Sequence, residues 1–311
     1  MIFIQKRNIL NISSPEVKDN EYIYLKISSS YPVFIYMNIL SPCPQAKLIM
    51  STNEDLLEAA GDGNVARLNQ LISANANVSI ANEDQRTPLH LAAESGQCEA
   101  VEILIRAKAA LDEVDESHNT PLHRAVRNGH TATVKKLIDA KATVDIKDCD
   151  FMNRQDRTPL HWATVFGDYT SMRMLIDAKA NVDAMDKVQK TPLHHAAWGG
   201  YFDAAQMLID AQASVDIRDG AGKTPLLLAA EVGDSEAVHV LVNARAAIEV
   251  RDAHGKAPLH WAAEGGYAKA VQSLLSANAA VDVEDDNGKT PLDSATECGH
   301  DAVVQLLTPS S

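Results

Sequence analysis

A short motif returns along this chain at a fixed spacing, and the spacing limits the folds that the chain can adopt. Seven prolines, each preceded by Thr or Ala and followed by Leu, lie 33 residues apart, with one interval of 38. They are Pro88, Pro121, Pro159, Pro192, Pro225, Pro258 and Pro291. Eight glycines, from Gly63 to Gly299, keep the same intervals. A constant period of this length is typical of a stacked repeat array, so we predict eight repeats.

Each repeat has the signals of two short helices. In residues 87–96, Thr87 suits an N-cap, Pro88 suits the first helical position and Gly96 suits the turn that ends the helix. A second apolar run follows at 101–105, and the polar residues 112–120 predict a hairpin-like finger to the next repeat. Helices this short are marginal alone, so neighbouring repeats must stack. The predicted fold is an all-α solenoid of helix-turn-helix units.

On these motifs the chain resembles the ankyrin repeat family. The copies read TPLHLAAESG (87–96), TPLHRAVRNG (120–129), TPLHWATVFG (158–167), TPLHHAAWGG (191–200), TPLLLAAEVG (224–233), APLHWAAEGG (257–266) and TPLDSATECG (290–299), with EDLLEAAGDG (54–63) as a degenerate first copy. The resemblance implies a row of helix pairs with projecting fingers and a concave groove that binds other proteins. It also implies that the motif histidine ties the fingers to the helices.

One departure from the family pattern is systematic. Where the family has Gly after the second helix, this chain has another residue: Asn75, Lys108, Lys141, Lys179, Gln212, Arg245 and Asn278. A non-Gly residue in the left-handed conformation costs about 1 kcal/mol, less for Asn. A basic side chain at a helix C-terminus recovers part of this cost. We therefore expect the fold to be kept, with a row of slightly strained caps.

The domain organisation divides at about residue 50. Residues 50–311 are predicted to be the ankyrin repeat domain, with polar, capping first and last repeats. Residues 1–49 lack the repeat, and we predict a poorly ordered N-terminal extension, or even an upstream leader; the alternative is a short membrane-contacting or partner-binding strand. Its most apolar run, residues 31–40, is too short to span a bilayer.

The single interval of 38 marks a five-residue insertion at 149–153, in the finger before the fourth repeat. Repeat proteins place insertions in loops, often on the binding face. A tolerated loop of greater length is the alternative, because lengthening a loop costs little. Phe151 and Met152 are apolar at the expected finger tip, which favours a role in binding.

Charge narrows the class of partner. The chain has a net charge of −14, but residues 1–49 hold five Lys or Arg against three Asp or Glu, so the array is near −16. An acidic surface repels nucleic acid and anionic membranes, and it favours a protein partner with a basic or mixed-charge surface. The four cysteines form no CxxC pair, and they do not have the spacing of a disulfide framework. This predicts free thiols and a location in the cytoplasm or nucleus.

The residues that resemble catalytic or ligand motifs follow the repeat instead. Gly220–Thr224 resembles the end of a phosphate-binding loop, but residue 217 is Ile and the same Gly-Lys pattern recurs at 255 and 288 in phase with the array. The motif histidines lie one per repeat, about 8–10 Å apart, too far to share a metal ion. We predict no enzyme activity, no metal and no cofactor.

The resemblance implies that partners contact the finger tips, the two residues before the helix-turn Gly and the residue after the motif His. Aromatic side chains gather at these positions in repeats four and five, where Trp162, Phe166 and Trp198 lie. We expect Trp162 and its counterpart Trp261 to pack on their own fingers. Phe166 and Trp198 are better candidates for contact with a partner protein. Finger lysines and helix-end glutamates predict a cationic line of tips above an acidic groove. The predicted partner-binding residues are Phe151, Met152, Trp162, Val165, Phe166, Lys187, Lys190, Trp198, Glu231 and Glu264.

The functional prediction is a non-catalytic, monomeric interaction module, acting as an adaptor, scaffold or inhibitor. Two alternatives stay open: the repeat portion of a larger enzyme or channel, and a purely structural spacer.

Overall fold

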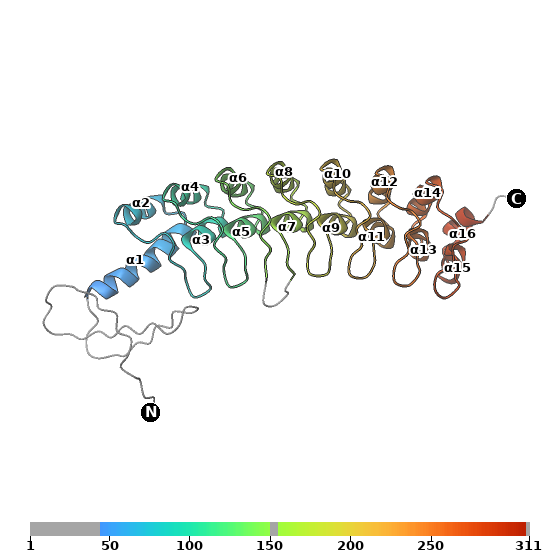
Figure 1. Cartoon of the computed structure of the whole chain (residues 1–311), viewed down its shortest axis with the longest axis horizontal. Coiled ribbons are helices and arrows are strands. Elements are labelled where there is room, and N and C mark those ends of the chain that lie inside the picture. The colour runs from blue at the N-terminus through green and yellow to red at the C-terminus, as the bar shows by residue number, and fades with distance from the viewer. Residues whose placement is uncertain (1–43, 150–154, 309–311) are drawn as a thin grey trace, which may run out of the picture. The chain divides into compact units, whose positions relative to one another are not determined.

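A computed structural model describes residues 44–149 and 155–308, which form sixteen helices and no strand (Figure 1). The chain divides into two units, residues 1–47 and 48–311, and all helices from α2 onward belong to the second. The inner helices are α1 (Pro44–Gly61), α3 (Pro88–Glu94), α5 (Pro121–Arg127), α7 (Pro159–Val165), α9 (Pro192–Gly199), α11 (Pro225–Val232), α13 (Pro258–Glu264) and α15 (Pro291–Glu297). The outer helices are α2 (Val65–Ser73), α4 (Cys98–Arg106), α6 (Thr131–Asp139), α8 (Tyr169–Asp177), α10 (Phe202–Asp210), α12 (Ser235–Asn243), α14 (Ala268–Ser276) and α16 (Asp301–Leu307).

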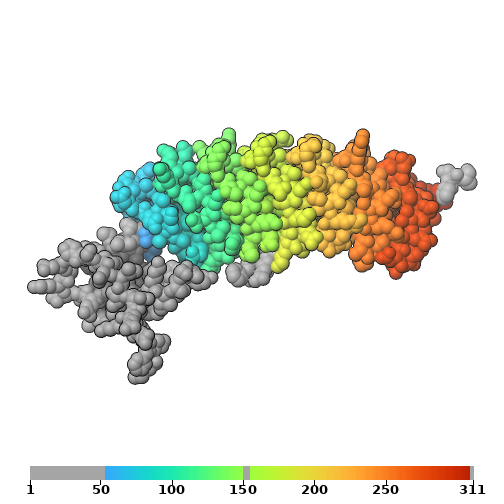
Figure 2. All heavy atoms as spheres, viewed as in Figure 1, coloured from blue at the N-terminus to red at the C-terminus, as the bar shows by residue number. Residues whose placement is uncertain are grey.

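The helices of the second unit stand in two rows. The outer helices form one row and the inner helices the other, and the fingers project from the inner row (Figure 1). From α3 onward, each inner helix packs against its own outer helix and against the inner helices of neighbouring repeats. The space-filling view shows a continuous body across these repeats (Figure 2). The predicted all-α repeat solenoid is confirmed.

The inner helices begin where the sequence predicts. Thr87 has an extended backbone with φ of −82° and ψ of 167°, and its hydroxyl accepts a hydrogen bond from the His90 N–H. Pro88 then fixes the first helical residue, and its missing N–H costs nothing at that position. The same start recurs at Thr120 and Thr290.

The core is a repeated set of Leu and Ala side chains. In the second repeat, Leu89, Ala92 and Ala93 of α3 and Leu104 of α4 are at most 1% exposed. Small alanines let successive helices approach closely, while each buried leucine contributes about 1.5–3 kcal/mol. Because this core continues from repeat to repeat, no repeat has to bury its apolar surface alone.

Buried histidines join consecutive repeats. The Nδ1 of His90 accepts hydrogen bonds from the N–H (3.1 Å) and the hydroxyl (2.9 Å) of Thr87. Its Nε2 therefore carries the proton, and it donates to the carbonyl of Asn119, 3.0 Å away, at the end of the next finger. The corresponding acceptors for the other motif histidines are Arg157 (from His123), Lys190 (from His161), Lys223 (from His194) and Lys289 (from His260). The expected link between fingers and helices is confirmed.

The departure from Gly after the second helix does not change the backbone conformation. The seven residues have φ between 61° and 73°, in the left-handed region that favours glycine. The N–H of the following alanine still closes the turn; for Ala180 it donates to the carbonyl of Leu175 at 3.0 Å. The strained caps predicted from the sequence are therefore present.

The first repeat differs from the others in the length of its inner helix. Helix α1 begins at Pro44, well before the first copy of the motif, because no Thr-Pro start limits it. It crosses the predicted domain boundary at residue 50, while the predicted extension falls mainly on residues 1–43, outside the described residues. The extension therefore stays a prediction.

The insertion leaves the base of its finger unchanged. In the third repeat's finger, Asp115 and Asn119 exchange hydrogen bonds: the Asp115 N–H donates to the Asn119 carbonyl, and the Asn119 N–H donates to the Asp115 carboxylate. In the longer finger, Asp148 and Arg157 make the same two bonds, at 2.9 and 2.8 Å. The two ends of the longer finger thus keep the usual geometry.

Replacing a strained cap by glycine is expected to stabilise the array slightly. Lys179 has a φ of 67° and an exposed side chain. Lys179→Gly should remove about 1 kcal/mol of strain, partly offset by the greater freedom of glycine in the unfolded chain. Asn75→Gly should gain less, because Asn tolerates this conformation better. Thermal melts measure both changes, and a lower Tm for Lys179→Gly would contradict the prediction.

Mild acid is expected to destabilise the array through its histidines. Burial lowers the pKa of His123 and His194 to about 4 and that of His161 to about 3, whereas an unfolded histidine titrates near pH 6.5. Below pH 6.5 the unfolded chain binds more protons, so the stability that these neutral rings contribute is complete above pH 6.5 and is lost as pH falls toward 4 and 3. The loss between pH 6.5 and 5 should be about 1.5 kcal/mol per histidine.

Urea unfolding across this pH range measures the effect. A matched variant is His194→Leu, because Leu227 already occupies the same position one repeat later. Its free energy of unfolding should depend less steeply on pH than that of the wild type. Equal slopes for the two proteins would show that His194 does not carry the acid sensitivity.

Candidate functional site

A buried aspartate shapes every finger from the third repeat onward. Its carboxylate accepts hydrogen bonds from the finger backbone; that of Asp186, for example, accepts from the N–H groups of Val188 (3.0 Å) and Lys190 (2.8 Å). The residues are Asp115, Asp148, Asp186, Asp219, Asp252 and Asp285. Our sequence interpretation missed them, although they recur every 33 residues, with one interval of 38 across the insertion.

In four repeats, the residue after the motif histidine binds this aspartate from the inner helix. The indole N–H of Trp162 donates to Asp148 at 2.7 Å, and that of Trp261 donates to Asp252 at 3.0 Å. Both tryptophans are half-buried and pack against the core. The expectation that they pack on their own fingers is confirmed, although the exposed part of each ring still faces solvent.

The partner of the aspartate sets its acidity. Burial raises the pKa of Asp148, and the hydrogen bond from the neutral Trp162 does not offset this. Burial also acts on Asp115, but the hydrogen bond and charge of Arg124 outweigh it and hold the pKa of that carboxyl below its usual value. In these two repeats, the side chain that follows the histidine therefore helps to set the acidity of the structural aspartate.

The predicted aromatic residues lie close together on repeats four and five. Phe166, at the end of α7, is 53% exposed and stacks on Trp162, with ring centroids 5.6 Å apart and an interplanar angle of 17°. Trp198, on α9, is 50% exposed, and the ammonium of Lys190 lies 5.3 Å from its ring centroid. Val165 is half-buried beside them in sequence.

Guanidinium groups cover Trp162. The Cζ of Arg127 lies 4.5 Å from the centroid of its ring, and the Cζ of Arg157 lies 4.7 Å away. We name Arg127, Arg157, Trp162, Phe166, Lys190 and Trp198 the aromatic–cation patch. It joins the ends of two fingers to the exposed sides of helices α5, α7 and α9.

The predicted separation of cationic tips from an acidic groove is wrong. Lys223 pairs with Glu231 at 2.6 Å, and Lys256 pairs with Glu264. The end of each finger lies directly over the end of its own inner helix, so these charges neutralise each other. Glu231 and Glu264, which were predicted to contact a partner, are held in ion pairs. Lys187 is exposed in the finger before repeat five, and its N–H donates to the carbonyl of Gln155 in the neighbouring finger.

A pocket of about 550 Å³ adjoins the patch between repeats five and six. It is lined by Val188, Lys190, Trp198, Asp219, Gly220, Ala221, Lys223, Leu228 and Glu231. Apolar side chains from two fingers and two inner helices therefore meet here with two lysines. Phe151 and Met152, the predicted tip of the longer finger, lie outside the described residues.

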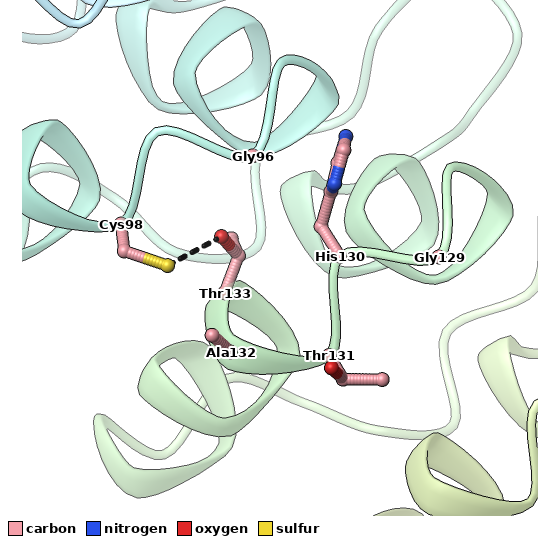
Figure 3. A pocket seen from close by; sticks show the side chains of 7 residues that line it. All are labelled: Gly96, Cys98, Gly129, His130, Thr131, Ala132 and Thr133. Atoms are coloured by element: carbon pink, nitrogen blue, oxygen red, sulfur yellow. Dashed lines mark hydrogen bonds between the residues drawn. The ribbon is translucent and has the colours of Figure 1, made fainter.

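A smaller pocket, of about 170 Å³, lies at the helix turns of repeats two and three (Figure 3). The thiol of Cys98 and the hydroxyl of Thr133 are 3.3 Å apart there, and they hydrogen-bond to each other. The other lining residues are small or polar: Gly96, Gly129, His130, Thr131 and Ala132. The lining contains no Asp, Glu, Lys or Arg side chain.

Residues 44–149 and 155–308 contain no group of three His, Cys, Asp or Glu side chains placed to hold a metal ion. No helix in those ranges has both the length and the apolar character needed to span a bilayer.

Comparison with known proteins identifies the family of this chain. A family model described as ankyrin repeats (3 copies) matches residues 56–148, 146–219 and 226–311, and no catalytic domain was detected. Among solved structures, the chain is similar to the crystal structure of the human ASB11 ankyrin repeat domain, at 28% sequence identity and a TM-score of 0.62, over 72% of this chain and 98% of that chain. A search of curated proteins gave no match. Arrays of this kind are generally protein-interaction modules, and this chain belongs to the ankyrin repeat family.

Proposed function

We propose that the chain is a non-catalytic adaptor, scaffold or inhibitor that binds a partner protein through the finger ends and inner helices of repeats four to six. The observation that supports this most directly is the exposure of Phe166 and Trp198, each about half exposed, on adjacent repeats. Aromatic side chains in a small cluster are typical of the residues that carry most of the energy of an interface. The chain is only 5% aromatic, so such clustering on one surface is informative.

The surroundings of these rings favour binding over mere packing. Trp162 and Trp261 use their indole N–H groups within the scaffold, whereas Trp198 has half of its surface free for a partner. The adjoining pocket offers Val188 and Leu228 as an apolar lining beside the ring of Trp198. An apolar side chain of a partner could be buried there, with lysines at the rim. We also propose that the protein acts as a monomer in the cytoplasm or nucleus.

Removing the two exposed rings is expected to reduce partner capture. Phe166→Ala/Trp198→Ala should lose most of the proteins that the wild type enriches in a quantitative pull-down or proximity-labelling experiment, because each truncation at such a site costs about 2 kcal/mol or more. Thermal melts should change little, since both side chains are half exposed.

The matched control is Tyr169→Ala/Phe202→Ala. These residues are 39% and 41% exposed, but they lie on the first turns of outer helices α8 and α10. The control should keep its partners. If the two double variants recover the same proteins, repeats four and five do not form the binding surface. A role as a purely structural spacer then becomes the better interpretation.

The longer finger is expected to contribute to binding more than to stability. Deleting residues 149–153 leaves Asp148 four positions from Arg157, the same separation as Asp115 and Asn119, so the finger can close with the same hydrogen bonds. The melt should therefore stay close to that of the wild type, because loop length has a small effect on stability. Partner capture should fall.

A Gly/Ser replacement of the same five residues separates side chains from loop length. It should weaken capture as the deletion does if Phe151 and Met152 make the contacts. A large loss of stability on deletion would instead identify the insertion as a packing element.

A further inference from the structure

A charge pair recurs between the finger and the inner helix of a repeat. The residue just before the motif is basic, and the residue eight positions later is glutamate. The pairs are Arg86–Glu94 at 3.2 Å, Lys223–Glu231 at 2.6 Å, Lys256–Glu264, and Lys289–Glu297 at 2.5 Å. In these repeats the cation at the end of the finger is neutralised within its own repeat.

Repeats four and five keep the cation and lack the acid. Arg157 stands before the fourth motif with Val165 eight positions later, and Lys190 stands before the fifth with Trp198. The third repeat reverses the pattern, because Arg127 occupies the position of the glutamate. Three consecutive repeats therefore place a positive charge on this surface without the carboxylate that their neighbours supply.

These cations rest on aromatic rings instead. Arg127 and Arg157 contact Trp162, and Lys190 contacts Trp198. A cation–π contact orients the charge, but the ring supplies no negative charge. The cations therefore keep their net charge and can still attract an anion.

Arg157 is poorly solvated. Its side chain is 15% exposed, and its Nε is buried with no hydrogen-bond acceptor among the described residues. The nearest carboxylate oxygen, on Asp186, is 3.9 Å from that Nε. A guanidinium in this position gains more from an added carboxylate than a fully hydrated one does, because charge-assisted hydrogen bonds strengthen away from water.

Apolar surface lies next to these charges. The pocket of about 550 Å³ has Val188, Trp198 and Leu228 in its lining, together with Lys190. Its other charged groups are engaged within the scaffold: Lys223 pairs with Glu231, and the Asp219 carboxylate accepts hydrogen bonds from the finger backbone. Val188 is 57% exposed and Trp198 is 50% exposed. A ligand that fits both features needs an apolar side chain for the pocket and negative charge for the neighbouring cations.

We propose that the aromatic–cation patch binds a short acidic segment of a partner protein, in which carboxylates flank an aromatic or aliphatic side chain. This inference rests on the proposed function and adds the chemistry of the partner. The carboxylates meet Arg157 and Lys190, and the apolar side chain enters the pocket beside Trp198. The chain's own first 49 residues are a poor occupant, because their net charge is +2.

The acidic stretch must be short. The array as a whole is strongly negative, so a long acidic partner would be repelled along most of its length. Screening limits that repulsion to about 8 Å at physiological salt, so a few carboxylates placed at the patch are governed by the nearest cations.

Peptide selection tests the inference with the full chain. A library of random short peptides displayed on phage is selected on the immobilised protein, and the enriched peptide is synthesised and titrated by fluorescence anisotropy. We expect enrichment of Asp and Glu around an aromatic or aliphatic residue, and an affinity that falls as salt is raised. The variant Trp198→Glu supplies the acid found at Glu231, Glu264 and Glu297, so it should pair with Lys190, stay folded and bind the peptide at least about tenfold more weakly.

The matched control is Phe202→Glu, which makes the same aromatic-to-acid change at an exposed residue of α10. An acid in the first turn of a helix is tolerated, and this variant should bind like the wild type. Enrichment of basic or uncharged peptides would overturn the inference. An equal loss of peptide affinity in both variants would also overturn it, as would an affinity that Trp198→Glu leaves unchanged. If Phe166→Ala/Trp198→Ala still reduces capture of natural partners in that case, the proposed function stands and only the acidic segment is refuted.

Discussion

The buried histidine present in five of the repeats is the interaction on which the placement of the fingers depends. One imidazole nitrogen accepts hydrogen bonds from the threonine that begins its own helix, and the other donates to the carbonyl that ends the next finger, as in His161 and Lys190. One side chain thus fixes the start of a helix and the position of the neighbouring finger. The ring must be neutral to make both bonds, and its burial keeps it so. Leu227 interrupts the series in repeat six, where a fully buried leucine takes the place of the imidazole. Hydrophobic stacking therefore supports the array, while the histidines set the orientation of the fingers.

The finger aspartates divide the surface into positions used by the scaffold and positions left for a partner. Each carboxylate closes its own finger and, in several repeats, also holds the residue after the histidine, whether that residue is Arg124, Trp162 or His195. Side chains at this position vary in kind but share one structural role. Variation there is weaker evidence of binding than variation at Phe166 and Trp198, whose exposed surfaces have no comparable task within the repeat.

The period of the sequence predicted most of the fold, because local signals repeat in phase with it. The Thr-Pro starts, the helix-turn glycines and the left-handed caps each depend on a few neighbouring residues. The pairing of Lys223 with Glu231 was not predicted, although its spacing of eight is visible in the sequence. A finger end and a helix end become neighbours only after the chain has turned between them, and the sequence alone suggested two separate charged lines. The length of α1 was missed for the opposite reason: the first repeat lacks a start signal, so nothing in the motif limits the helix. The predicted contacts of Phe151 and Met152 stay predictions, because these residues lie outside the described part of the chain.

The distribution of charge explains how an acidic array can favour a partner of mixed charge. At separations up to about a Debye length, an approaching protein meets the net charge of the array, which attracts a basic surface. At contact, it meets individual side chains, and several of these are already paired. Glu231 and Glu264 are neutralised by lysines, whereas Lys190 rests on a ring and the carboxylate nearest to Arg157 is 3.9 Å away. The net charge of the array therefore attracts positive charge on an approaching partner, whereas the cations of the patch attract negative charge at contact. A partner satisfies both when a basic surface carries a short acidic and apolar segment, because the first increases the rate of encounter and the second fixes the register on repeats four to six.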